Sequence, residues 1–121
     1  MCMFFQNLTT DEIEKLEEIL NHYYMIAIEN EHGCIAYTNS RLQKLFDMTE
    51  TELLDISPDL LWENVVSYEV GTTSHGEWVM YLKRGEKVLC KGVVIQIHSS
   101  SIAKKTLYIF HTISREHSSY E

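Results

Sequence analysis

The chain has few of the residues that mark nucleic-acid-binding or membrane-bound proteins. Its ten Lys and Arg residues are outnumbered by eighteen Asp and Glu residues, which gives a net charge of −8, and its basic residues are scattered. Binding to nucleic acid or to an anionic membrane needs clustered basic side chains, so we expect neither as a direct partner. No apolar run approaches the roughly eighteen residues that a membrane-spanning helix needs.

Cysteine and proline are also scarce. The three cysteines, Cys2, Cys34 and Cys90, are odd in number and far apart, and there is a single proline. This pattern indicates neither a disulfide framework nor a zinc motif, and we expect a reducing, cytoplasmic location. With 121 residues, 45% of them hydrophobic, the chain is long enough for one domain with its own core.

An amphipathic helix is predicted near the N-terminus. Thr9 and Glu12 have the spacing of a capping box, in which each side chain bonds the other residue's backbone N–H. The apolar residues that follow lie on one helical stripe, opposite several acidic side chains: Ile13, Leu16, Ile19 and Leu20. This stripe has to be covered either by the sheet of the same domain or by the same helix of a second copy.

Residues 25–46 predict a hairpin that runs directly into a helix. Residues 25–28 and 34–38 are short β-prone segments, and the polar residues between them end in Gly33, which tolerates a turn. Asn39 occupies the position of a helix N-cap, and the residues after it show helical apolar spacing.

The rest of the chain changes from helical to strand periodicity. A capping box at Thr49 and Glu52 predicts a second short helix, and Ser57 followed by Pro58 predicts a third, whose apolar residues continue to Val66. Three strands are expected after it, at residues 77–83, 87–98 and 105–113, with a turn at 84–86, a loop at 99–104 and a β-bulge near Gly92. These elements predict an α+β fold with a five-stranded antiparallel sheet and short helices on one face.

In this order of elements the chain resembles the PAS domain, a sensory module of bacterial signalling and transcription-regulating proteins. The resemblance rests on the hairpin at residues 28–39, on residues 46–54, on the strand start at 75–78 and on the turn at 83–86. It implies an N-terminal extension at 1–8, a PAS-like sensor domain at 9–116, and at 117–121 a tail or linker to an output segment. The Asp-Ile-Thr that often ends the last strand of the family is replaced by Thr112, Ile113 and Ser114, and the segment between Pro58 and Gly76 is short, which predicts an abbreviated helix and a small pocket.

The resemblance also directs attention to cofactors. A flavin photoreceptor needs a reactive cysteine that residues 55–70 lack, and haem would need an axial ligand for which His75 and His111 are the candidates. A lone histidine on an apolar face is more often a core residue than a ligand, so haem and flavin are disfavoured and a small organic ligand stays open. No catalytic or metal-binding motif is present in the sequence, and we expect no catalysis.

Two sets of candidate residues follow. The first would line a cavity between the sheet and the short helices, although close packing favours a filled core there: Ile28, Tyr37, Leu45, Trp62, Val66, Trp78, Met80, Gly92, Val94, Ile109 and His111. The second would form a homodimer interface from the N-terminal helix and an exposed outer sheet face: Ile13, Leu16, Ile19, Leu20, Tyr108 and Phe110. The resulting hypothesis is a sensory and dimerisation module that acts on an output domain or partner protein. The alternative is a receptor with a small molecule or haem in the cavity.

Overall fold

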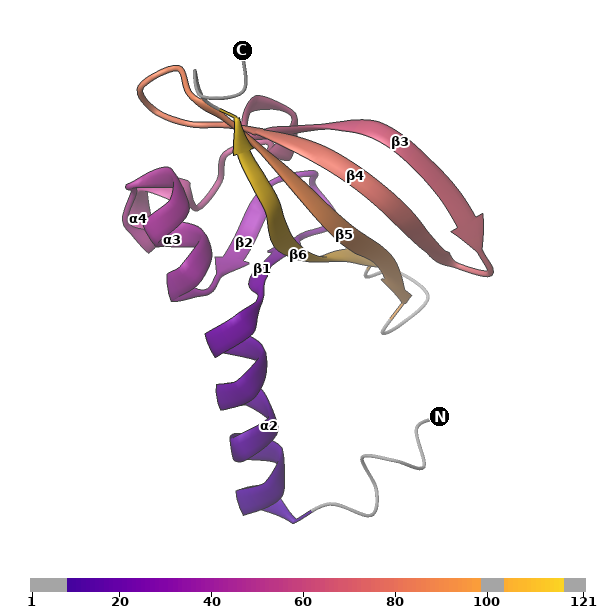
Figure 1. Cartoon of the computed structure of the whole chain (residues 1–121). Helices are drawn as coiled ribbons and strands as arrows, with labels where there is room; N and C mark the ends of the chain where they lie inside the picture. The colour runs from indigo at the N-terminus through magenta and orange to yellow at the C-terminus, as the bar shows by residue number, and fades with distance from the viewer. Residues whose placement is uncertain (1–8, 99–103, 117–121) are drawn as a thin grey trace.

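A computed structural model describes residues 9–98 and 104–116 of the chain. The predicted extension 1–8, most of the predicted loop at 99–104 and the predicted tail 117–121 lie outside the described residues. The first described element is α2 (Thr10–Tyr23), which starts at the predicted capping box: Glu12 N donates to Thr9 Oγ1 at 3.2 Å and Thr9 N donates to Glu12 Oε1 at 2.9 Å. Figure 1 shows α2 extending away from the sheet.

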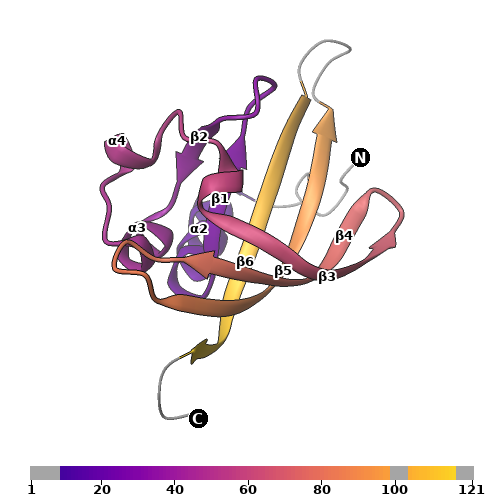
Figure 2. The same cartoon turned by 90° about the horizontal axis from the view of Figure 1, so that it is seen from above.

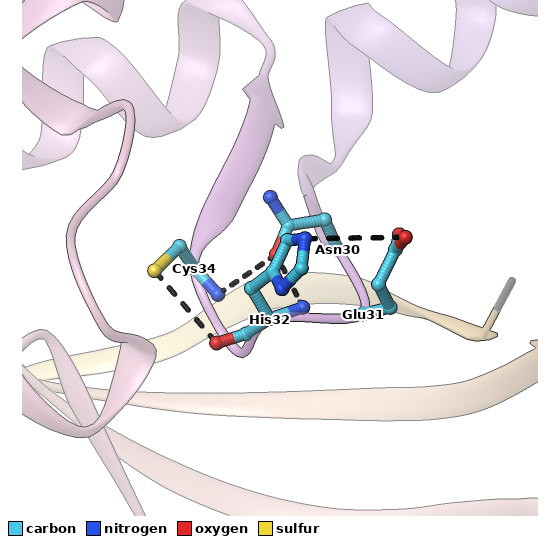
Figure 3. A network of polar contacts seen from close by, with 4 residues as sticks. All are labelled: Asn30, Glu31, His32 and Cys34. Carbon is cyan, nitrogen blue, oxygen red and sulfur yellow. Dashed lines mark hydrogen bonds and ion pairs between the residues drawn. The ribbon is translucent and has the colours of Figure 1, made fainter.

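The predicted hairpin is confirmed as β1 (Met25–Glu29) and β2 (Ile35–Thr38), which pair antiparallel. Its turn is stabilised by Asn30, whose Oδ1 accepts from the backbone N–H of His32 at 2.9 Å and of Cys34 at 3.1 Å (Figure 3). Gly33 completes the turn with a φ of 81°, a value that costs glycine little.

Two capped helices follow as predicted. Asn39 Oδ1 accepts from Leu42 N at 3.2 Å and starts α3 (Ser40–Phe46). The Thr49 and Glu52 capping box starts α4 (Glu50–Leu53). Both helices lie together on one side of the sheet (Figure 2), where Leu42, Phe46 and Leu53 enter the core.

The predicted third helix is wrong. Pro58 opens only a single 3-10 turn, η1 (Pro58–Leu60), and the chain then forms β3 (Trp62–Val70). The apolar residues of this segment are β-branched and aromatic, which favours an extended chain. Gly71 and Thr72 form a two-residue turn, with Gly71 at a φ of 64°. This turn leads into β4 (Thr73–Tyr81), which begins before the predicted strand start at 75–78 and includes His75.

The sheet has six strands, one more than predicted, and every neighbouring pair is antiparallel. β5 (Lys87–His98) and β6 (Lys104–Glu116) complete the order β2-β1-β6-β5-β4-β3. The predicted bulge near Gly92 is wrong, since Gly92 pairs regularly with Gly76 and Phe110. The irregularity between β5 and β6 lies nearer the start of β5, between Leu89 and Cys90.

The short helices cover only one of the two faces of the sheet, which we call the inner face. The inner face carries α3, α4 and η1, and its side chains make the core with theirs: Met25, Ala27, Ile35, Leu42, Phe46, Leu53, Leu61, Trp62, Trp78, Met80, Val88, Cys90 and Phe110. Because side chains alternate along a strand, the strand residues that lie between these core residues point to the opposite face of the sheet, which we call the outer face. Ile26, Ile109, Val93 and His75 form one cross-strand row on that outer face.

Candidate functional site

The space between the inner face and the short helices is filled by the protein's own aromatic rings. The Trp62 ring contacts Phe110 with centroids 5.2 Å apart and Tyr108 with centroids 5.0 Å apart. The ring centroids of Trp78 and Phe110 are 5.4 Å apart, and those of Phe46 and Trp62 are 6.3 Å apart. The two contacts of Trp62 with Tyr108 and Phe110 and the contact of Trp78 with Phe110 are edge-to-face, an arrangement that stabilises a close-packed interior.

Gly92 lies where Phe110 needs space. A Cβ atom at this position would stand 2.4 Å from Phe110 Cδ1 and 2.9 Å from the Ile109 carbonyl oxygen. The missing side chain therefore admits an aromatic ring of the same protein, and not a ligand as the sequence suggested.

The residues predicted to line one cavity are divided between the two faces. Six lie on the inner side, in or against the core or, for Gly92, under the Phe110 ring: Leu45, Trp62, Trp78, Met80, Gly92 and Val94. The other five lie on the outer face: Ile28, Tyr37, Val66, Ile109 and His111. Only the backbone of Gly92 meets members of both groups, since it also lines an outer groove with Val66 and His111.

The predicted exposure of Tyr108 and Phe110 on the outer face is wrong. Phe110 is fully buried and Tyr108 packs against the core. Both rows of β6 are rich in apolar residues, so alternation alone does not tell which row faces inward. The aromatic row turns inward, opposite Met25 and Ala27 of β1.

The outer face is hollowed by two apolar grooves. One, of about 420 Å³, lies beside α2 and is lined by residues that include Leu20, Ile26, Ile28 and Ile109. The other, of about 330 Å³, lies towards β3, and its lining includes the residues Val66, Tyr68, His75, Gly76, Glu77, Lys91, Gly92, Val93 and His111. A surface of this kind is typical of a site that contacts another molecule.

Helix α2 continues this apolar surface. No residue of α2, which the structure describes over its whole length, is fully buried. Ile13, Leu16 and Leu20 are half-buried, whereas Ile19 is 53% exposed and Tyr23 is 62% exposed. The predicted stripe is therefore covered in part, with one edge left open to solvent.

Asn39 joins α2, β1 and α3 through one buried side chain. Besides capping α3, its Oδ1 accepts from Ile26 N at 3.0 Å. Its Nδ2 donates to Asn21 Oδ1 at 3.0 Å and to the Tyr24 carbonyl oxygen at 2.9 Å. The sequence predicted only the cap, because bonds to Asn21, Tyr24 and Ile26 depend on how the chain folds back.

A surface cleft lies beside the aromatic cluster of Trp62, Trp78 and Tyr108. It measures about 530 Å³ and is lined by Pro58, Asp59, Trp62, Glu63, Asn64, Trp78 and Tyr108. The Tyr108 hydroxyl donates to Glu29 Oε1 at 2.5 Å. Burial, followed by this bond and by the charges of Glu29 and Asp59, raises the pKa of Tyr108 well above its ordinary value, so the phenol stays neutral.

The buried Cys90 thiol is not an activated nucleophile. Burial raises the pKa of the Cys90 thiol to about 11, which suppresses the nucleophilic thiolate at neutral pH. Over residues 9–98 and 104–116, no three His, Cys, Asp or Glu side chains gather as a metal site would require. In the same residues, none of the helices is long and apolar enough to cross a membrane.

The element order, the antiparallel sheet and the helices on one face define an α+β domain. Neither a scan against models of protein families nor a search of curated proteins found a match. Solved structures do match. A PAS domain of an HTR-like protein from Haloarcula marismortui has a TM-score of 0.63 at 15% identity, covering 85% of this chain and 96% of that chain.

Two further structures agree with this result. A PAS domain from Colwellia psychrerythraea has a TM-score of 0.67 at 13% identity, covering 84% of this chain and 97% of that chain. A PAS domain from a two-component sensor histidine kinase has a TM-score of 0.61 at 9% identity, covering 87% of this chain and 99% of that chain. The chain therefore has the PAS fold, with β3 as a sixth strand.

Proposed function

We propose that the chain is a sensory and dimerisation module of a cytoplasmic signal-transduction or transcription-regulating protein, without catalysis of its own. The fold supports a sensory role, since one of the similar domains belongs to a sensor histidine kinase. The observation that carries the dimer is the apolar outer face beside the half-covered helix α2. An output domain or partner protein would receive the signal.

The dimer surface that we propose differs in part from the sequence prediction. It keeps Ile13, Leu16, Ile19 and Leu20 of α2 and replaces Tyr108 and Phe110 by outer-face residues such as Ile26 and Ile109. Each copy carries a charge of −8, so charge opposes association and burial of apolar surface has to drive it.

Sedimentation velocity over a range of concentrations tests the dimer. We expect a monomer–dimer equilibrium that Ile19→Lys weakens, although this substitution reduces the repulsion between copies. Glu18→Gln is the matched control, because it changes the charge by the same amount at an exposed position outside the apolar stripe. A strict monomer at high concentration, or equal effects of both substitutions, would contradict the proposal.

Asn39 offers a path by which a change at α2 reaches the sheet. Its side chain binds Asn21 and the Tyr24 carbonyl at the end of the helix, and it binds Ile26 on β1. β1 pairs with β6, so a movement of α2 would pass through this asparagine into the centre of the sheet. The signal would leave through β6 or through α2 itself.

The cleft beside Trp62 and Trp78 supports a second candidate function, a small-molecule receptor. Its volume of about 530 Å³ is enough for a small organic ligand, while the filled interior leaves little space for haem. A ligand there would change tryptophan fluorescence and raise the unfolding temperature in a ligand screen. No response across such a screen, together with a featureless visible spectrum, would leave the dimerisation module as the proposed function.

A further inference from the structure

The two edge strands of the sheet, β2 and β3, differ in whether another segment bonds their free edge. At the β2 edge, Ile35 N donates to Ile56 O and Asp55 N donates to Ile35 O, both at 2.9 Å. The segment after α4 therefore covers the edge of β2. At the other edge, β3 pairs with β4, and no other strand of the described residues pairs with it.

β3 has only part of the usual protection of an edge strand, namely a bulge and two glutamates. It is nine residues long and contains no Lys, Arg or Pro, the residues that commonly block strand addition. Val66 is 53% exposed, Tyr68 63% and Val70 58%. Alternate residues of such a strand direct backbone N–H and C=O groups towards solvent.

A bulge limits the regular part of β3. The pairing with β4 shifts between Asn64 and Val66, and Asn64 Nδ2 fills the gap by donating to the carbonyl oxygens of Val66 at 3.1 Å and Glu77 at 3.0 Å. Beyond the bulge, residues 66–70 pair regularly up to the turn. This five-residue segment is long enough to accept one more strand.

The side chains of β3 indicate the chemistry of that strand. Val66 and Tyr68 face outward beside the groove of about 330 Å³ that His75 and Val93 also line. Tyr68 stacks on His75 with ring centroids 5.4 Å apart. The charged residues of β3 are two glutamates, Glu63 and Glu69, so the edge is acidic as well as apolar.

We propose that β3 is a strand-addition site for an extended segment of a partner protein in which apolar and basic residues alternate. The backbone of the segment would bond the free edge, and its apolar side chains would lie beside Val66 and Tyr68. Its Lys or Arg side chains would face Glu69. A second copy of this chain is a poorer occupant, since it would bring the same glutamates and the same charge of −8.

Nuclear magnetic resonance titration of the whole labelled chain tests this site. The probe is a synthetic peptide of about ten residues that alternates Val and Lys, enough for one strand. The control peptide has the same composition with its Val and Lys residues in two blocks, so its charge is equal and its pattern is lost. We expect the alternating peptide to shift the amides of residues 66–70 and to protect those that point away from β4, and the block peptide to leave them unchanged.

A matched pair of substitutions separates the edge from the overall charge. Glu69→Lys should weaken binding of the alternating peptide about fivefold or more, because a cross-strand attraction becomes a repulsion. Glu14→Lys, at an exposed position on α2, makes the same charge change and should leave binding nearly unaltered. Glu69 accepts from Ser74 Oγ at 2.8 Å, so the unfolding midpoint of each variant is compared first.

Three results would overturn the proposal. One is equal binding of the two peptides, and another is equal weakening by the two substitutions, since each would indicate general attraction to an acidic protein. The third is protection of the outward-pointing amides of residues 66–70 that increases with protein concentration without peptide, which would make a second copy the occupant of the edge.

Discussion

Replacing Asn39 should cost far more stability than the loss of a helix cap. Its side chain is buried, with 3% exposure, and makes four hydrogen bonds to three elements. Asn39→Ala removes the acceptor of the Leu42 and Ile26 N–H groups and the donor to the Tyr24 carbonyl oxygen.

The expected magnitude follows from these separate losses. An N-cap replaced by alanine costs about 1 kcal/mol. A buried donor or acceptor left without a partner costs about 1–3 kcal/mol, and here the Ile26 N–H loses its acceptor outside any helix. The free energy of unfolding should therefore fall by about 3 kcal/mol, a large share of the total for a small domain.

Urea unfolding measures this loss as a shift of the midpoint at constant slope. Thr49→Ala is the matched control, because it removes an exposed cap from α4 and should cost about 1 kcal/mol. Asn39→Asp keeps the two acceptor bonds but places a buried carboxylate oxygen against the Tyr24 carbonyl oxygen, so it should not recover the stability that Asn39→Ala loses. An Asn39→Ala cost no larger than that of Thr49→Ala would refute the reasoning.

Three further predictions concern the core. Gly92→Ala should lower the free energy of unfolding, measured in urea, by about 1–3 kcal/mol, because the added Cβ meets the Phe110 ring. Adding Phe110→Leu to this variant should recover part of the loss, and full stability of Gly92→Ala would contradict this packing. Cys90 should react with iodoacetamide much more slowly in the native chain than in urea at pH 8, and a native rate equal to the unfolded rate would show an accessible thiol. Because its folded pKa of about 11 exceeds the unfolded value, the stability that the neutral thiol contributes should be lost as pH rises from the unfolded pKa towards 11. Tyr108→Phe should remove the bond to Glu29 and lower the free energy of unfolding by about 1 kcal/mol. In an absorbance titration it should remove one tyrosine that ionises above the ordinary range, and an unchanged titration curve would contradict the raised pKa.

The parts of the fold that local chemistry determines could be predicted from the sequence. The capping boxes at Thr9 and Thr49 and the cap at Asn39 act within a few residues, and the structure has all three. The hairpin before Asn39 was predictable for the same reason, since Gly33 and Asn30 make its turn from neighbouring residues.

The segment from Trp62 to Val70 shows where local reasoning fails. Leu61, Trp62, Val65 and Val66 have a spacing that fits a helix, and Pro58 is a good helix start. Pairing with β4 over the whole of β3 decides the outcome, and this pairing involves residues that follow in the chain. The β-branched and aromatic residues were the available signal, and the Gly71 turn supported it.

The faces of β6 were ambiguous for a different reason. Leu107 and Ile109 are as apolar as Tyr108 and Phe110, so alternation gives two equivalent choices. The volume of Trp62 and Trp78 settles the choice in the structure, because their rings pack with Phe110 in one cluster. The predicted dimer residues Tyr108 and Phe110 were assigned to the wrong face as a result.

An isotope-filtered nuclear Overhauser experiment tests the proposed dimer most directly. Labelled and unlabelled chains are mixed, and contacts between copies are recorded at the methyl groups of the outer face and α2. The proposal predicts intermolecular contacts from Ile19 of one copy to outer-face methyls such as those of Ile26 and Val93 of the other. Contacts confined to other surfaces, or none at concentrations where the chain is fully folded, would contradict it.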